Sequence, residues 1–245
     1  GGTGKTTVAA LLTRALVRRG AAPVLAIDAD PATNLHLALG LPVPATVGDL
    51  REGMKLEAGQ GTLGVVISRQ DYVDRELRLA LEEGDQVALI AMGRPEGQGC
   101  CCAVNHLLRQ TLDEVGKGYA YIVVDNEAGM EHISRRTTRD VDLLLVVTDP
   151  TVRGVRTAQA IAAMADEVDV RVRRKVLVVN RVAGDLPDEL AGAIAETGLE
   201  VAAHIPADDH VADLDARGLP LLQLNGSSPA AAAVDAIAER ILREL

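Results

Sequence analysis

Short apolar runs alternate along the chain with longer stretches in which apolar residues recur every three or four positions. An unbroken apolar run of four or five residues predicts a strand covered on both faces, and the three-to-four spacing predicts an amphipathic helix. The predicted strands are Val24–Ile27, Val87–Ala91, Tyr121–Val124, Leu143–Val147, Val176–Val179, Val201–Ile205 and Leu219–Leu222. The predicted helices are Thr6–Arg19, Val104–Val115, Val155–Val168, Leu186–Thr197 and Ala230–Leu245. The alternation predicts an α/β fold of three layers, in which a mostly parallel sheet carries helices on both faces. Residues 42–84 are the least readable part of the chain.

Composition and charge narrow the classes of function. The 245 residues, 48% of them hydrophobic, suffice for one domain spanning 1–245 with a large core. No apolar run approaches the roughly 18 residues that a membrane-spanning helix requires. The net charge of −10 disfavours a nonspecific grip on nucleic acid or anionic lipid. Because Phe and Trp are absent, stacking of aromatic side chains on bases is not an available binding mode either.

The strongest chemical signal is the glycine-rich segment that opens the chain. Its residues are Gly1, Gly2, Thr3, Gly4, Lys5, Thr6 and Thr7. Glycines let successive backbone N–H groups turn toward one anion, a lysine reaches the β- and γ-phosphates, and a hydroxyl serves Mg²⁺. A helix follows at once, so its N-terminal dipole adds to the anion site. The alternative is a glycine-rich tail before an ordinary helix.

No strand precedes this loop in the sequence, and the chain does not begin with Met. We expect a native first strand to run into Gly1, so that residues 1–245 form a phosphate-loop domain that is truncated at its N-terminus.

Three aspartates follow predicted strands. Asp28 and Asp125 each end a strand, and Asp30 lies two residues after the first of them. Open α/β sheets place their ligands at the carboxyl ends of the strands, and Mg²⁺ prefers one or two carboxylates together with water and phosphate oxygens. We therefore predict that Thr6 ligates Mg²⁺ with Asp28 and Asp125 in its outer shell, and that Asp30 orients an attacking water. The alternative for Asp28 and Asp30 is helix capping. The backbone N–H of Gly129 is expected to approach the γ-phosphate.

The chain's three cysteines are adjacent, at Cys100, Cys101 and Cys102. An odd, contiguous set is a poor disulfide framework, so we expect a reducing, cytoplasmic setting and a metal or redox role. In extended backbone Cys100 and Cys102 point the same way and Cys101 points opposite. Two thiolates supply only half of the ligands for a four-coordinate metal site, and a twofold dimer would bring four sulfurs together. A square-planar arrangement of the four sulfurs suits Ni²⁺, and a tetrahedral one suits Zn²⁺. The alternative is three small buried residues without a ligand role.

The motifs GGTGKTT, DADPATNL and VVDNEAG resemble those of the deviant Walker A phosphate-loop ATPases. That group includes MinD, ParA, the nitrogenase iron protein and the nickel-insertion ATPases of carbon monoxide dehydrogenase. The segments VVNR and HIPADDHV resemble the family's adenine-contacting motifs. The resemblance implies that Asn180, Arg181, Pro206 and Asp208 bind the base, and that Lys5 and the loop amides bind phosphate. The family's signature lysine would lie immediately before Gly1.

Two further segments narrow the resemblance. MGRPEGQGCCCAVN, which ends at Asn105, and DNEAGMEHISRRTTRDVD, which begins at Asp125, resemble segments of the nickel-insertion ATPases, of the CooC type. This branch implies a homodimer that binds ATP or ADP with Mg²⁺ and holds Ni²⁺ or Zn²⁺ at the dimer interface through Cys100 and Cys102. The implied client is nickel-dependent carbon monoxide dehydrogenase or a related nickel enzyme, with no nucleic-acid or membrane partner. The alternatives are a MinD- or ParA-like spatial organiser and a reductase like the nitrogenase iron protein.

Overall fold

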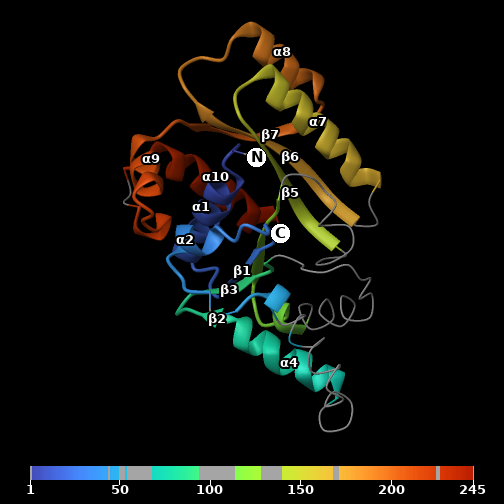
Figure 1. Ribbon diagram of the computed structural model, residues 1–245. Coiled ribbons are helices and arrows are strands. Elements are labelled where there is room, and N and C mark those ends of the chain that lie inside the picture. Colours follow the sequence, from blue (N-terminus) through green and yellow to red (C-terminus); the bar gives the residue numbers. More distant parts are fainter. Residues whose placement is uncertain are drawn as a thin grey trace.

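The molecule has three layers, with helices on both faces of a central region of strands (Figure 1). The computed structural model describes residues 2–43, 45–49, 53, 68–93, 114–127, 140–167, 171–224 and 227–244. In chain order the elements are α1 (Lys5–Arg18), β1 (Val24–Asp28), α2 (Leu35–Leu39), α4 (Arg69–Ala80), β2 (Glu82–Glu83), β3 (Val87–Ala91), β4 (Tyr121–Asp125), β5 (Asp140–Thr148), α7 (Val152–Glu167), β6 (Arg171–Val182), α8 (Asp188–Glu196), β7 (Glu200–Pro206), α9 (Asp209–Ala216), the 3₁₀ helix η2 (Leu221–Gln223) and α10 (Pro229–Glu244).

The strands form two sheets. One has the order β2-β3-β1-β4, in which β1 is parallel to both β3 and β4 and only the two-residue β2 is antiparallel. The other has the order β5-β6-β7 and is parallel throughout. Every residue of β1 and β3 is buried, as expected of apolar strands inside a parallel sheet. The predicted class, a mostly parallel α/β fold, is confirmed.

The core of the described residues consists mainly of three large apolar clusters. The largest joins α1, α2, η2 and α10 to one face of the strands, and its fully buried members include Leu11, Leu16 and Leu35. A second packs α4 on the opposite face of β1 and β3, and a third packs α7 and α8 on β5 and β6. Figure 1 shows α7 and α8 on one side of the β5-β6-β7 sheet and α1 and α10 on the other. The phosphate-loop helix α1 therefore lies in the main core.

Several elements differ from the sequence-based prediction. The apolar run Leu219–Leu222 was expected to be a strand, but it enters η2, which places Leu221 in the core at 3% exposure. Pro220 precedes η2 and cannot donate to a strand ladder, which accounts for the difference. Helices α2, α4 and α9 and the short strand β2 are additional elements, and β6 extends five residues before the predicted Val176. The predicted helix Val104–Val115 lies almost wholly outside the described residues.

One edge of β4 and one edge of β5 have no strand partner within the described ranges, because β4 pairs with β1 alone and β5 with β6 alone. Both strands are less buried than β1 and β3, and Ile122 in β4 is 46% exposed. The expected strand before Gly1 would lie outside this sequence and stays a prediction.

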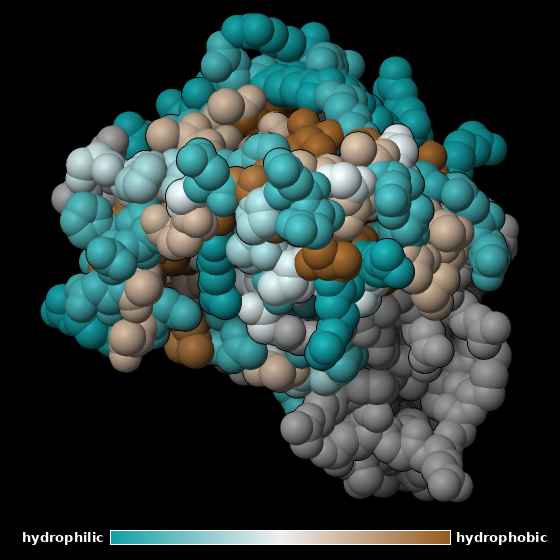
Figure 2. Space-filling model, turned by 90° about the horizontal axis from the view of Figure 1, so that it is seen from above, coloured by the Kyte–Doolittle hydropathy of each residue, from teal (hydrophilic) through white to brown (hydrophobic). Residues whose placement is uncertain are grey.

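None of the described helices is long and apolar enough to cross a bilayer. Figure 2, which views the molecule from the α8 side, shows hydrophilic residues over most of the described part of that face, with smaller hydrophobic areas between them.

Candidate functional site

The phosphate-binding loop lies where the carboxyl ends of the strands meet the start of α1. Gly2 and Gly4 have left-handed backbone, with φ of 87° and 85°. A Cβ on Gly4 would lie 2.3 Å from Nδ2 of Asn180, so this position requires glycine for its φ and for its close packing. Because Gly4 precedes Lys5 without a side chain, no side-chain oxygen caps the first N–H groups of α1. Those donors are left available for an anion.

A hydrogen bond joins the loop to β4. The hydroxyl of Thr6 donates to Oδ2 of Asp125 at 2.6 Å, across 119 residues of sequence. Asp125 is 3% exposed. Burial is the main cause that raises its pKa to about 6, and the neighbouring Asp28 and Asp30 add to the rise, while the Thr6 hydrogen bond and Lys5 oppose it. The predicted magnesium residues are therefore brought together, and they form an acidic group that favours a cation.

Asp28 is fully buried at the end of β1, and each of its carboxylate oxygens is already used. Oδ1 accepts the N–H of Asp30 at 3.1 Å, and Oδ2 accepts the N–H of Leu35 at 2.9 Å. Burial raises the pKa of Asp28, and these two hydrogen bonds oppose the rise. Asp28 therefore does cap a helix in part, because its Oδ2 accepts the N–H of Leu35, the first residue of α2. Its Oδ1 also holds the turn that carries Asp30. An engaged carboxylate of this kind suits a position one water away from a metal ion.

Asp30 lies in the tight turn that follows β1. Its Oδ1 accepts the N–H of Ala32 at 2.8 Å, and its carbonyl accepts the N–H of Thr33 at 3.0 Å. Thr33 has a left-handed φ of 47°. The turn fixes Asp30 beside the other two carboxylates, as the electrostatic effect of Asp30 on both of them indicates.

The end of β6 closes the other side of the loop. Nδ2 of Asn180 donates to the carbonyl of Thr3 at 2.8 Å, and Nη1 of Arg181 donates to the carbonyl of Gly2 at 3.0 Å. Arg181 has a left-handed φ of 60°, at an irregular stretch of the β6–β7 ladder. Strained backbone of this kind is common at ligand sites. The two residues predicted to contact adenine are thus beside the phosphate loop, and here they hold its carbonyls.

The ends of β6 and β7 lie together, since Val182 pairs with Pro206 and its carbonyl accepts the N–H of Ala207 at 2.9 Å. Asp208 follows directly and caps α9. Of the remaining predicted site residues, Thr7 lies in the first turn of α1. Gly1, Cys100, Cys102 and Gly129 lie outside the described residues.

Sequence reasoning did not single out Asn126. Its Nδ2 donates to the carbonyl of Val124 at 3.4 Å, and its Oδ1 is buried and finds no hydrogen-bond donor among the described residues. A buried acceptor without a partner is uncommon in folded proteins, and beside Asp125 it offers a further contact for a ligand or water. The sequence offered one indication of this site residue, namely its position directly after Asp125 at the end of β4.

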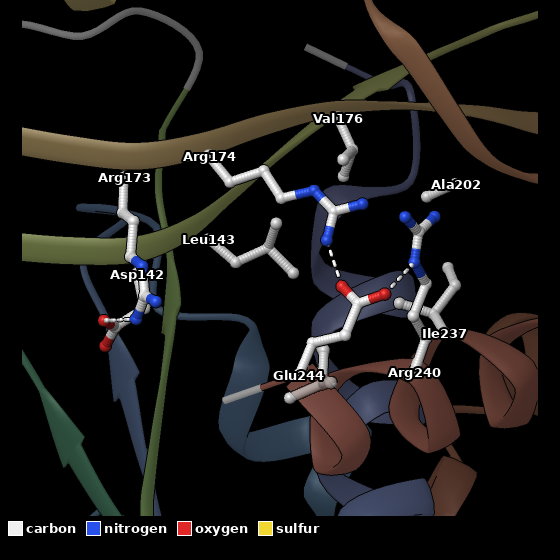
Figure 3. Close-up of a pocket in the computed structure, with 10 residues that line it drawn as sticks. Asp142, Leu143, Arg173, Arg174, Val176, Ala202, Ile237, Arg240 and Glu244 are labelled. Atoms are coloured by element: carbon white, nitrogen blue, oxygen red, sulfur yellow. Dashed lines mark hydrogen bonds and ion pairs between the residues drawn. The ribbon is translucent and has the colours of Figure 1, made fainter.

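A separate cavity of about 230 Å³ lies at the opposite ends of the strands, between α10 and the amino ends of β5 and β6 (Figure 3). Its rim carries a closed ring of ion pairs, in which Arg174 and Arg240 each contact both Glu200 and Glu244. Leu143 and the apolar face of α10 form its floor. The ring fastens the last turns of α10 to β6 and β7, and it lies away from the phosphate loop.

Among the described residues, no group of three or more His, Cys, Asp or Glu side chains is arranged to hold a metal ion by itself. Mg²⁺ in nucleotide sites does not need such a group, because it keeps waters and takes phosphate oxygens in addition to one or two carboxylates. The pair of Thr6 and Asp125, with Asp28 behind it, fits that pattern.

Comparisons with known proteins agree with this geometry. The family described as CobQ/CobB/MinD/ParA nucleotide binding domain matches residues 1–221. An uncharacterized ATP-binding protein of Methanocaldococcus jannaschii is 37% identical over 244 residues, covering 100% of this chain and 96% of that protein. The carbon monoxide dehydrogenase accessory protein CooC of Rhodospirillum rubrum is 30% identical over 255 residues, covering 98% of this chain and 94% of that protein.

Among solved structures, the cell division ATPase MinD of Pyrococcus furiosus has a TM-score of 0.70 and 23% identity, covering 100% of this chain and 95% of that one. The family match, the relatives and the loop geometry confirm the resemblance stated from the motifs. The chain belongs to the CobQ/CobB/MinD/ParA nucleotide-binding family of phosphate-loop ATPases.

Proposed function

We propose that this ATPase dimerises with ATP and serves the maturation of a nickel enzyme, with carbon monoxide dehydrogenase or a related enzyme as its client. The observation that supports the nucleotide part is the Thr6–Asp125 hydrogen bond, which brings a hydroxyl and a carboxylate of the kind that Mg²⁺ prefers to the glycine loop. The nickel part is supported by the adjacent cysteines and by the 30% identity to CooC.

At the phosphate end, backbone N–H groups from Gly2 to Thr6 bind the β- and γ-phosphates, and Lys5 neutralises part of their charge. Thr6 would hold Mg²⁺, with Asp125 behind it through the Thr6 hydroxyl, and Asp28 would act through water because its oxygens already accept two N–H groups. Bound Mg²⁺ supplies positive charge to the phosphate oxygens. Asp30 orients the attacking water from the turn after β1. Gly129 donates its N–H toward the γ-phosphate.

At the base end, the amide of Asn180 and the segment from Pro206 to Asp208 enclose adenine. The pairing of Val182 with Pro206 supports this, because it brings the ends of β6 and β7 to the same side of the loop. Asn180 and Arg181 also hold the loop carbonyls, so the base end and the phosphate end share residues.

The proposed transition-metal site uses Cys100 and Cys102 from both subunits, which gives four thiolates for Ni²⁺ or Zn²⁺. The metal ion is the cargo that the ATPase prepares for its client. The nucleotide state changes the distance between the two subunits and so changes this site.

The competing proposal is a spatial organiser that acts on a membrane or on DNA, like MinD or ParA. A membrane-binding organiser needs a helix with a free apolar face. In α10 that face is buried in the core, through Ala230, Val234, Ile237 and Ile241. The ring of ion pairs around Glu244 further fastens this helix to the sheet. These contacts leave α10 without the free apolar face of a membrane-binding helix, and they favour a role in maturation of a nickel enzyme over that of a membrane-binding organiser.

The deciding experiment is metal titration of the purified homodimer with ATP, followed by cysteine variants. We expect one Ni²⁺ or Zn²⁺ per dimer, lost in Cys100→Ser and in Cys102→Ser. Cys101→Ser is the matched control and should retain the metal, because in extended backbone a side chain between two ligands would point away from them. Loss of metal in Cys101→Ser alone would show that the ligands are assigned wrongly. Binding of anionic vesicles or of DNA by the wild type, with no metal bound, would favour the spatial organiser.

A further inference from the structure

The carboxylate of Asp208 accepts hydrogen bonds from the start of two helices. Oδ1 accepts the backbone N–H of His210 at 2.9 Å and that of Val211 at 3.4 Å, both in the first turn of α9. Oδ2 accepts the backbone N–H of Ala230 at 3.1 Å and the hydroxyl of Ser228, at the start of α10. A carboxylate offers about four acceptor positions, so its capacity is used by these donors.

Ser228 fixes this arrangement from the other side. It is 2% exposed, and its Oγ also accepts the N–H of Ala231 at 3.0 Å, so it caps α10. Two helix N-termini, each with a partial positive charge, thus meet at one carboxylate. Burial opposes ionisation there, but the hydrogen bonds of Ser228 and of the helix N–H groups prevail and lower the pKa of Asp208.

Helix α10 also connects to the phosphate end of the site through α1. Arg19, at the end of α1, pairs with Asp235 of α10 at 3.2 Å. Arg14 of α1 is 3% exposed, and its guanidinium donates to the carbonyl of Leu224 at 2.6 Å, just before α10 begins. The helix that carries the phosphate loop and the turn at the base end are therefore fastened to the same part of the chain.

We infer that Asp208 is a positioning residue, which holds the Pro206–Asp208 turn against α10 so that the turn meets the base, and that Asp208 itself does not bind the base. This differs from the role that the family resemblance implies. It rests on the proposed location of the base beside Asn180. A ligand N–H could use this carboxylate only by displacing a donor that caps a helix.

Ser228→Ala gives the cleanest test, because the Ser228 side chain is buried and its role is to hold Asp208 and α10. We measure KM and kcat for ATP and GTP with the full chain. Loss of the cap should let the turn move away from the base, so we expect KM for ATP to rise about fivefold, with kcat changed by less than about twofold. The ratio of kcat/KM for ATP to that for GTP should not change. Asp208→Asn, which keeps one acceptor oxygen, should raise KM and also leave the ratio unchanged.

Ser68→Ala is the matched control. Ser68 caps α4, where it accepts the N–H of Asp71 at 3.1 Å, and it should lower stability without changing KM. An unchanged KM in Ser228→Ala would overturn the positioning role. An ATP:GTP ratio that falls tenfold or more in Asp208→Asn would also overturn the inference, because it would make Asp208 a base ligand. If the wild type itself fails to bind ATP, the proposed nucleotide site fails, and that outcome is seen before any variant is compared.

Discussion

Replacing Asp125 by Asn should make the nucleotide-free protein more stable at neutral pH. The carboxyl group is 3% exposed, and its pKa is about 6 in the folded state against 3.8 for the ordinary side chain. Between these pH values the folded protein binds more protons than the unfolded chain, so the free energy of unfolding falls as pH rises. The stabilisation from the protonated carboxyl is fully present below pH 3.8 and is lost once pH has risen through 6.

The size of this loss follows from the gap between the two pKa values. Each pKa unit corresponds to about 1.36 kcal/mol, so a gap of about 2.2 units costs about 3 kcal/mol at pH 7.5. Asn is neutral at every pH, has the same shape, and can still accept the hydroxyl of Thr6. We therefore expect Asp125→Asn to raise the free energy of unfolding by about 2–3 kcal/mol at pH 7.5. For a chain of this length that corresponds to about 5–10 °C in Tm.

The assay is unfolding by urea and by heat at pH 4 and pH 7.5, in EDTA and without nucleotide. At pH 4 the variant and the wild type should differ by less than about 1 kcal/mol. Asp185→Asn is the control, because Asp185 is exposed in the turn after β6 and should change neither curve. Equal stability at pH 7.5, or a difference that does not grow between the two pH values, would refute the reasoning. In the presence of Mg²⁺ and ADP the wild type should be more stable than Asp125→Asn. The reason is that bound metal and nucleotide stabilise the wild type more than the variant.

Further variants separate the parts of the site. Lys5→Ala should weaken ATP binding at least about tenfold, because it removes the charge that faces the phosphates, whereas Asp30→Ala should keep ATP affinity and slow turnover, which leaves an ATP-bound dimer. Isothermal titration and light scattering measure these two properties, and an equal loss of affinity in both variants would remove the water-orienting role from Asp30. Gly4→Ala should abolish ATP binding in the same titration, because its Cβ would meet Asn180 at 2.3 Å and its φ is 85°. Gly192→Ala, in the middle of α8 with open space around it, should instead stabilise the protein by about 0.5–1 kcal/mol in urea unfolding, and destabilisation would contradict that assignment of α8.

The parts of the fold that could be predicted are those with a local cause. β1 and β4 are short apolar runs that end in aspartate, so the sequence alone placed Asp28 and Asp125 at one edge of a sheet. The run Leu219–Leu222 is equally apolar, yet it forms a 3₁₀ turn, because apolar character alone does not distinguish a strand from a buried turn.

The role of Asp208 could not be predicted for a different reason. A polar residue after a strand is typical both of a ligand and of a helix cap. The residue that distinguishes the two, Ser228, lies twenty positions away, and nothing in the sequence pairs it with Asp208. The division of the described strands into two sheets could not be predicted either, because it depends on which strands pair with each other in the folded chain.

The contacts that hold the phosphate loop span most of the chain, and this has a consequence for folding. Thr6 meets Asp125 across 119 positions, and Thr3 meets Asn180 across 177. Contacts between residues so far apart form late, because the loss of chain entropy must be met before they contribute. A chain that has folded only as far as β4 still lacks the partner of Thr3, so its loop is held on one side alone. Nucleotide binding should therefore appear in step with the last stage of refolding, and nucleotide added during refolding should trap finished molecules without changing the rate at which they form.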